Sequence, residues 1–116
     1  MLKVFQPKEF LTEVNAFEIR DWVQESLSAG ATHLLIDLHN VKFINSSGLG
    51  ALAVALKMIR EADGEFALCN LNDQARMTLE ISGMDQAIAI YDRCADFEAT
   101  VPNRLQPETL AASGEY

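Results

Sequence analysis

The sequence predicts an α/β domain built on a small, mostly parallel sheet with helices packed against it. Short apolar runs alternate along the chain with amphipathic segments of helical length, which favours right-handed crossover connections. The run at residues 34–38 is apolar at four of its five positions, as expected for a central strand of a parallel sheet that is covered on both faces. A chain of 116 residues is long enough to form one hydrophobic core.

The first elements can be placed by their stop signals. Residues 3–6 predict a short strand that Pro7 ends. Asn15 is predicted as the N-cap of a first helix, with Glu18 completing a capping box. The buried stripe of this helix is Ala16, Ile19, Val23 and Leu27, and Gly30 ends it. A strand follows at residues 33–38.

The remaining elements continue the same alternation. A helix at 47–62, closed by Asp63 and Gly64, is followed by a strand at 65–71. Asn72 caps the next helix, which ends at Gly83, and a strand follows at 86–91. A last helix is capped by Asp92, buries Cys94, Phe97 and Val101, and ends at Pro102. We therefore expect a single domain over residues 1–101 and a flexible C-terminal tail over residues 102–116.

Composition and charge narrow the classes of partner. The formal net charge is −8, from 17 acidic and 9 basic residues, so no excess of basic side chains is present to neutralise phosphates. This opposes binding to nucleic acid or to an anionic membrane, and solubility is the simplest role for the acidity. The N-terminus has no apolar signal core and no run has the length of a membrane span, so we expect a cytoplasmic protein.

The residues of an enzyme active site are missing from the pattern. His33 and His39 flank the central strand, but no motif supplies the carboxylate and oxyanion hole that a Ser–His pair needs. No Gly-x-Ser-x-Gly, dinucleotide-binding or P-loop motif is present. Cys69 and Cys94 are interpreted as small core residues, too few and too far apart for a disulfide framework or a metal site. We expect no catalysis, no cofactor and no metal.

The most informative segment is Phe43-Ile44-Asn45-Ser46-Ser47-Gly48-Leu49-Gly50, between a strand and an almost wholly apolar helix. Asn45 or Ser46 can serve as the N-cap, and a serine then lies on the positive end of the helix dipole. Both serines could be only caps and turn residues. Two glycines so close together destabilise a helix, however, which favours a functional reason for Gly48 and Gly50.

The helix that follows predicts a docking face. On a wheel of about 100° per residue, Leu49, Leu52, Leu56 and Ile59 form the core stripe. Small and apolar residues occupy the opposite side, where a surface helix normally carries polar groups. We therefore predict a partner-binding surface made of Asn45, Ser46, Ser47, Gly48, Gly50, Ala51, Val54 and Met58. A phosphate on the serine would bring about −1.5 to −2 charges into that surface and weaken docking.

At this point the chain resembles a known family. The segment from Leu34 to Gly50, the strand Gly64-Glu65-Phe66-Ala67-Leu68-Cys69 and the helix end Glu80-Ile81-Ser82-Gly83-Met84 are similar to STAS domains, specifically to bacterial anti-sigma factor antagonists. The resemblance covers roughly residues 2–101 and implies a STAS-like fold without catalysis. It also implies that Ser47, directly before the first glycine, accepts a phosphoryl group from an anti-sigma factor with serine kinase activity. A serine phosphatase would reverse this step.

The chain departs from the family pattern at two positions near the serine. Asn45 stands where the family usually has Asp, and Glu9-Phe10-Leu11-Thr12 replaces its Gly-x-Leu-Asp turn. The N-terminus is also shorter by one strand, which leaves a sheet edge for a weak homodimer. The alternative function is a STAS scaffold, or a small-ligand-binding module, that is not phosphorylated. Ser47→Ala separates the two, since it abolishes only a phospho-switch.

Overall fold

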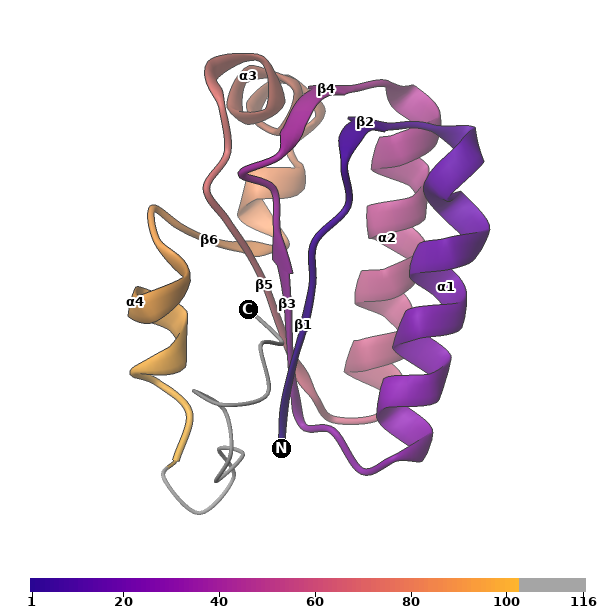
Figure 1. Cartoon of the computed structure of the whole chain (residues 1–116), viewed down its shortest axis with the longest axis vertical. Helices are drawn as coiled ribbons and strands as arrows, with labels where there is room; N and C mark the ends of the chain where they lie inside the picture. Colours follow the sequence, from indigo (N-terminus) through magenta and orange to yellow (C-terminus); the bar gives the residue numbers. More distant parts are fainter. Residues whose placement is uncertain (103–116) are drawn as a thin grey trace.

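A parallel four-stranded sheet lies at the centre of the domain in the computed structural model, which describes residues 1–102 (Figure 1). Its strand order is β1-β3-β5-β6, formed by Leu2–Phe5, His33–Asp37, Glu65–Cys69 and Ala89–Tyr91. A separate parallel pair joins β2 (Glu9–Leu11) to β4 (Val41–Ile44). The α/β class and the mostly parallel sheet predicted from the sequence are confirmed.

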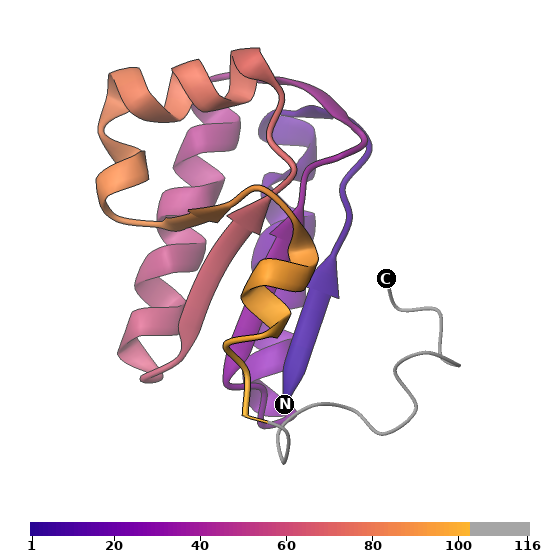
Figure 2. The same cartoon turned by 90° about the vertical axis from the view of Figure 1, so that its left-hand side faces the viewer.

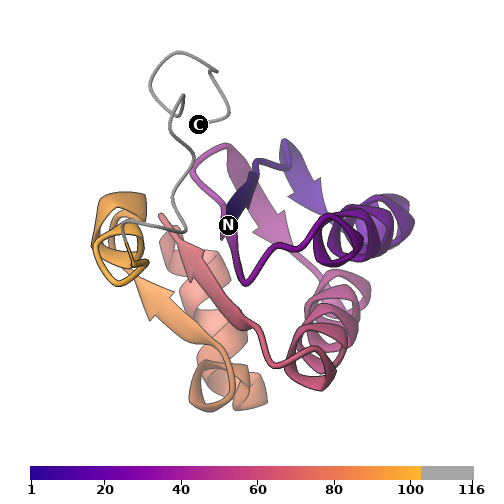
Figure 3. The same ribbon diagram turned by 90° about the horizontal axis from the view of Figure 1, so that it is seen from below.

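The helices cover the two faces of the sheet unequally. The two long helices, α1 (Glu13–Ser28) and α2 (Ser46–Glu61), pack against each other on one face, and the short α4 (Cys94–Glu98) lies on the other (Figures 2 and 3). At the end of the domain where α2 begins, α3 (Asp73–Ser82) packs on β4 and is followed by the 3-10 helix η1 (Met84–Gln86). None of the helices within residues 1–102 combines the length and apolar character needed to cross a bilayer.

The core is divided by the sheet. Alternate residues of β3 and β5 point to opposite faces, so Leu34 and Leu68 pack with the α1–α2 layer, whereas Leu35 and Cys69 pack with Phe97 of α4. Both faces of these central strands are therefore buried. This is why their sequence is a continuous apolar run without alternation.

Two predicted helix starts are wrong. Thr12, and not Asn15, is the N-cap of α1: its hydroxyl accepts a hydrogen bond from the Val14 backbone N–H at 3.2 Å. Asn15 occupies the third helical position and its side chain accepts from the Thr12 backbone N–H, so the capping box lies three residues earlier than predicted. At the last helix Arg93, and not Asp92, is the N-cap residue, and it makes no side-chain capping bond.

The other predicted elements lie close to their expected positions, apart from β6 and the end of α4, which is at Glu98 and not at Pro102, so that Val101 lies beyond the helix. Gln86 belongs to η1, so the last strand begins at Ala89. Asn72 caps α3 as predicted, accepting from the Ala75 N–H at 2.8 Å, and Gly83 ends that helix in the left-handed conformation. The strands β2 and β4 were not predicted. Apart from Pro102, the predicted tail lies outside the described residues.

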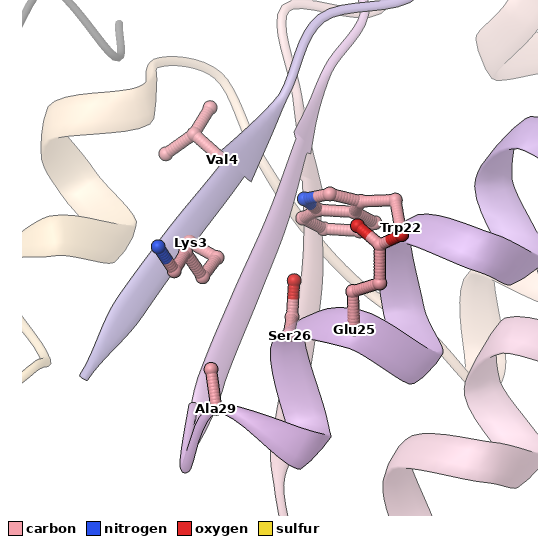
Figure 4. Close-up of a pocket in the computed structure, with 6 residues that line it drawn as sticks. All are labelled: Lys3, Val4, Trp22, Glu25, Ser26 and Ala29. Atoms are coloured by element: carbon pink, nitrogen blue, oxygen red, sulfur yellow. The ribbon is translucent and has the colours of Figure 1, made fainter.

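Within the described residues, β1 is an edge strand of the four-stranded sheet and pairs only with β3. A groove of about 390 Å³ follows this edge, lined by Lys3 and Val4 of β1 and by Trp22, Glu25, Ser26 and Ala29 at the end of α1 (Figure 4). Trp22 stacks on Phe5 with ring centroids 5.2 Å apart, which fixes α1 against the edge strand.

Candidate functional site

The N-terminus of α2 is anchored by Asn45, one of the two N-cap candidates. Its side-chain oxygen accepts a hydrogen bond from the Gly48 N–H at 2.9 Å, and its backbone N–H donates to the Leu11 carbonyl at 3.2 Å. Its side-chain amide donates to a carboxylate oxygen of Glu13 at 3.3 Å. Asn45 thus joins the start of α2 to β2 and to the start of α1, so the two helix N-termini lie side by side (Figure 1).

Ser46 and Ser47 are the first two residues of α2, and both are exposed. Within residues 1–102 neither hydroxyl makes a hydrogen bond, because Asn45 already performs the capping. Their position at the positive end of a sixteen-residue helix favours an added negative charge. The serine hydroxyls are therefore free to react with or bind a partner.

Gly48 allows α2 to begin directly against β2. A β-carbon at this position would overlap the main-chain carbonyl of Leu11 and would also meet the side chain of Ile44. Gly50 is different, since nothing lies within 4 Å of the position of its missing β-carbon. The first glycine therefore has a structural reason, whereas the second leaves open space beside Ser47.

A groove between α1 and α2 contains that open space. It has a volume of about 410 Å³, and it is lined by Ala16, Phe17 and Arg20 of α1 and by Ser47, Gly50, Ala51 and Val54 of α2. Except for Arg20 and Ser47 these residues are apolar or glycine. Phe17 is 71% exposed and Val54 48%, so both present apolar surface to solvent. The groove can hold an apolar segment whose end reaches Ser47.

The predicted docking face is open only in part. Ala51 is 8% exposed, because α1 packs against this side of α2, and it lies at the bottom of the groove. Met58 is half-buried against the main core and does not line the groove. In the core stripe, Leu52 and Ile59 are buried as predicted, whereas Leu49 and Leu56 are half-buried. The helical-wheel prediction assumed that α2 packs against the domain on one side only. That assumption is wrong, because α2 also packs against α1.

The apolar surface continues from the groove over residues that the sequence analysis missed. Val14 and Phe17 of α1 are exposed, and Phe10 of β2 is paired in register with Phe43 of β4, both also exposed. A second groove at the start of α1 includes Phe10 and Val14. We call Phe10, Val14, Phe17, Phe43 and Val54 the apolar patch. Val14 and Phe17 could have been found because they lie off the buried stripe of α1.

Glu13 supplies a carboxylate beside the cap. Hydrogen bonds from its own backbone N–H and from the Asn45 side chain lower the pKa of this fully exposed carboxyl. The site therefore combines two helix N-termini with one ionised carboxylate. Sequence reasoning missed this residue because it depends on how α1 and α2 pack.

A second cluster lies at the carboxyl ends of β3 and β5, on the α4 side of the sheet. Cys69 and Cys94 form a disulfide, which corrects the prediction that they are too far apart to pair. Asp37 lies opposite Cys69 in the β3–β5 register and is 5% exposed. Burial acts to raise the pKa of Asp37, but hydrogen bonds from Asn70 and His39 outweigh it and the pKa is lowered.

Fold and site together define a small α/β domain with an exposed helix-start serine at the rim of an apolar groove. The sequence profile of the STAS domain family matches residues 2–97. The chain belongs to the STAS domain family.

Relatives and solved structures agree with this assignment. The chain is 37% identical over 60 residues to an anti-sigma F factor antagonist of Paenibacillus polymyxa, an alignment that covers 52% of this chain and 51% of the relative. The match thus spans about half the length of that protein. The solved structure of TM1081 from Thermotoga maritima has a TM-score of 0.77 and 28% identity, covering 85% of this chain and 80% of that one.

A third comparison shows the fold alone. SpoIIAA, an anti-sigma factor antagonist solved in its unphosphorylated form, has a TM-score of 0.69 and 19% identity, covering 86% of this chain and 90% of its own. The Bacillus protein of the same name has also been solved in a phosphorylated form.

Proposed function

We propose that this protein is an anti-sigma factor antagonist that binds a cognate anti-sigma factor with serine kinase activity and is switched off by phosphorylation of Ser47. One observation carries the proposal: the hydroxyl of Ser47 is exposed and without a hydrogen-bond partner among the described residues, at the start of α2 and at the rim of the apolar groove. The same surface can thus be a docking site and a kinase substrate.

The apolar patch supplies the docking energy in this proposal. Exposed aromatic side chains such as Phe17 and Phe43 bury large areas when a partner covers them, and such anchors dominate most protein interfaces. Ser47 lines the end of the groove, where a partner's polar groups would make directional contacts, and Asn45 caps the helix start beside it. The interaction requires no chemistry from this chain, so we propose a binding protein and not an enzyme.

Phosphorylation would oppose this docking through charge. A phosphoserine at position 47 adds about −1.5 to −2 charges beside a surface that the partner must desolvate. The Glu13 carboxylate bonded to Asn45 adds a like charge nearby. The helix N-terminus can stabilise the phosphate in the free protein but does not remove the desolvation cost on binding. We therefore propose that the unphosphorylated form captures the partner and that a serine phosphatase restores it.

The names of the relatives support the same role. The protein of Paenibacillus polymyxa is an antagonist of an anti-sigma factor, and SpoIIAA exists in both phosphorylated and unphosphorylated forms.

The first test is intact-mass spectrometry of the protein purified from its own host, in growth and in stress, with fragmentation to locate the site. We expect a reversible gain of one phosphate on Ser47. Ser47→Ala should remain unmodified and retain the partner, whereas Ser47→Asp should lose it. Ser46→Ala is the matched control, because Ser46 is also exposed but does not line the groove. Partner capture by a protein never modified at Ser47 would reject the switch.

A second candidate is a scaffold or small-ligand-binding module that is not phosphorylated. The groove itself favours this candidate. Its lining is mostly apolar, and its volume of about 410 Å³ lies in the range of small-molecule pockets. Ser47→Ala should then leave binding of the ligand or partner unchanged, while Gly50→Phe, which fills the groove, should abolish this binding. A weak homodimer through the open edge of β1 is compatible with either function. Sedimentation at rising protein concentration tests the dimer.

A further inference from the structure

The cluster at the ends of β3 and β5 contains three side chains that can bind a metal ion. Oxygen of Asp37 and the sulfur atoms of Cys69 and Cys94 all lie within 4.8 Å of one another. Two of these residues end neighbouring strands and are partners in register, and Cys94 is the first residue of α4. Three separate elements therefore deliver one ligand atom each to the same point.

We propose that Cys69, Cys94 and Asp37, when the two cysteines are reduced, form a zinc site that replaces the disulfide as the link between α4 and β5. Two thiolates and one carboxylate suit Zn²⁺, which accepts sulfur and oxygen ligands together. Mg²⁺ and Ca²⁺ require oxygen ligands throughout and do not suit this set. With three protein ligands, a water molecule takes the fourth position, on the side where Cys94 is only half-buried.

The ligand atoms need only small movements to reach zinc geometry. In a tetrahedral site with Zn–S bonds of about 2.3 Å, two sulfur atoms are about 3.8 Å apart. In the disulfide the two sulfur atoms are bonded and therefore closer than this, and the Cα atoms of the two cysteines are 5.5 Å apart. After reduction, rotation of the cysteine side chains can move the two sulfur atoms apart toward the separation that zinc requires.

The carboxylate of Asp37 is already oriented for this role. One of its oxygens accepts from the Asn70 side-chain amide at 2.9 Å and from the His39 backbone N–H at 3.0 Å. The other accepts from the Gln6 amide at 3.1 Å and lies 2.9 Å from the His39 ring nitrogen Nδ1. Asn70 also reaches the Cys94 sulfur at 3.6 Å, so one amide contacts two of the ligands. Such outer contacts orient the ligands of metal sites.

The proposed site does not increase the buried charge. Asp37 is a buried carboxylate, and its partners other than His39 are neutral amides or backbone groups. The two thiolates offset the charge of Zn²⁺, so the occupied site keeps the single negative charge that Asp37 already carries beside the disulfide.

The steps balance without any further reactant. A phosphine reductant converts the disulfide to two thiols, and the phosphine becomes its oxide with oxygen from water. Zinc binding then displaces the two thiol protons to solvent. Oxidation of the thiols prevents binding, so zinc affinity depends on the redox state of the same two sulfur atoms.

The test uses the full chain, stripped of metal and reduced by a phosphine without oxygen. Zn²⁺ is titrated against a chromophoric chelator, and Co²⁺ is added separately to detect thiolate-to-cobalt charge transfer. We expect one Zn²⁺ per reduced chain and none on the oxidised chain. Cys69→Ser and Cys94→Ser should lose the charge-transfer band and the tight binding. Asn70→Ala should weaken binding by roughly 10–100-fold, as for other outer contacts.

Asp21→Asn is the matched control, because Asp21 is exposed on α1 and outside the cluster, and it should bind as the unmodified chain does. If a cysteine variant fails to fold, the oxidised and reduced forms of the unmodified chain still decide the question. Absence of binding to the reduced chain, or equal binding by the oxidised chain, would show that the cysteines serve only as a disulfide.

Discussion

The α-carbon of Gly48 faces the main-chain carbonyl of Leu11 so closely that no side chain fits between them. The same carbonyl accepts the Asn45 backbone N–H, so the start of α2 is fixed against β2 by both a hydrogen bond and close packing. This contact places Ser47 at the rim of the groove. The position of the serine therefore depends on a glycine that is not itself exposed.

Gly48→Ala should destabilise the domain by about 1–3 kcal/mol, because the added methyl group meets rigid backbone. Gly50→Ala is the matched control. It places a methyl group in open space and removes a helix-interior glycine, so it should raise the free energy of unfolding by about 0.5–1 kcal/mol. Urea unfolding followed by circular dichroism measures both. Equal effects of the two substitutions would contradict the proposed close contact.

The sequence predicted the elements with strong local signals. The continuous apolar runs identified the central strands β3 and β5, and Asn72 with Gly83 bounded α3. It did not predict β2 and β4, because these strands are only three and four residues long and their burial does not alternate. These strands are stabilised by pairing with each other, and this pairing cannot be recognised from the sequence of either segment alone.

The candidate site was predictable in its local part only. Ser47 and the Asn45 cap follow from residue types at a helix start, whereas Phe17 and Glu13 join them through the packing of α1 on α2. The capping box of α1 was read in the wrong frame because Thr12 and Asn15 are both good caps three residues apart. The disulfide depends on the placement of α4, since its cysteines are 25 residues apart in sequence.

The side chain of Gln74 in α3 makes the two hydrogen bonds to the last residue of β4 that a further neighbouring strand would otherwise make. Its side-chain oxygen accepts from the Ile44 N–H at 2.9 Å, and its amide donates to the Ile44 carbonyl at 3.0 Å. Gln74→Ala should leave both backbone groups without partners and lower the free energy of unfolding by about 1–3 kcal/mol. Gln24→Ala, at an exposed position of α1, should change it by less than about 0.5 kcal/mol. Similar losses in both variants would argue against the Gln74 bridge.

Phe17 should contribute to partner binding and hardly at all to folding. It is 71% exposed in the apolar patch, so Phe17→Ala should change stability by less than about 0.5 kcal/mol. Binding to the proposed anti-sigma factor partner should weaken by more than about 1 kcal/mol, as for other aromatic anchors that an interface buries. Ile81→Ala, also highly exposed but on α3, is the control. Calorimetry that finds equal affinities for the two variants would remove Phe17 from the interface.

The free energy of unfolding should fall as the pH decreases through the interval in which His33 becomes protonated. Burial lowers the pKa of His33 below its usual value of 6.5, and the positive N-terminus adds to this effect against the opposing charge of Glu65. Between the lowered pKa and 6.5 the unfolded chain binds more protons than the folded chain, so the free energy of unfolding rises with pH. Below the folded pKa no further loss from this group is expected.

His33→Gln should remove this part of the pH dependence. The difference between the unfolding free energies of the unmodified chain and the variant, measured from about pH 5 to about pH 8, should increase with pH and level off above 6.5. A difference that is constant, or that decreases with pH, would show that burial does not lower the pKa of His33.

Reduction of the Cys69–Cys94 disulfide should destabilise the domain. The bond closes a loop between residues 25 apart, for which the chain-entropy model gives a contribution of about 3.5 kcal/mol. The contacts of Phe97 with the sheet-side core and with Tyr91, at 5.5 Å between ring centroids, remain in the reduced form, so α4 should stay docked under native conditions. Chemical unfolding with and without a phosphine reductant, both in the presence of a chelator that removes zinc, measures the difference. If reduction leaves the free energy of unfolding unchanged, noncovalent contacts alone hold α4 on the sheet, and the disulfide does not contribute to stability.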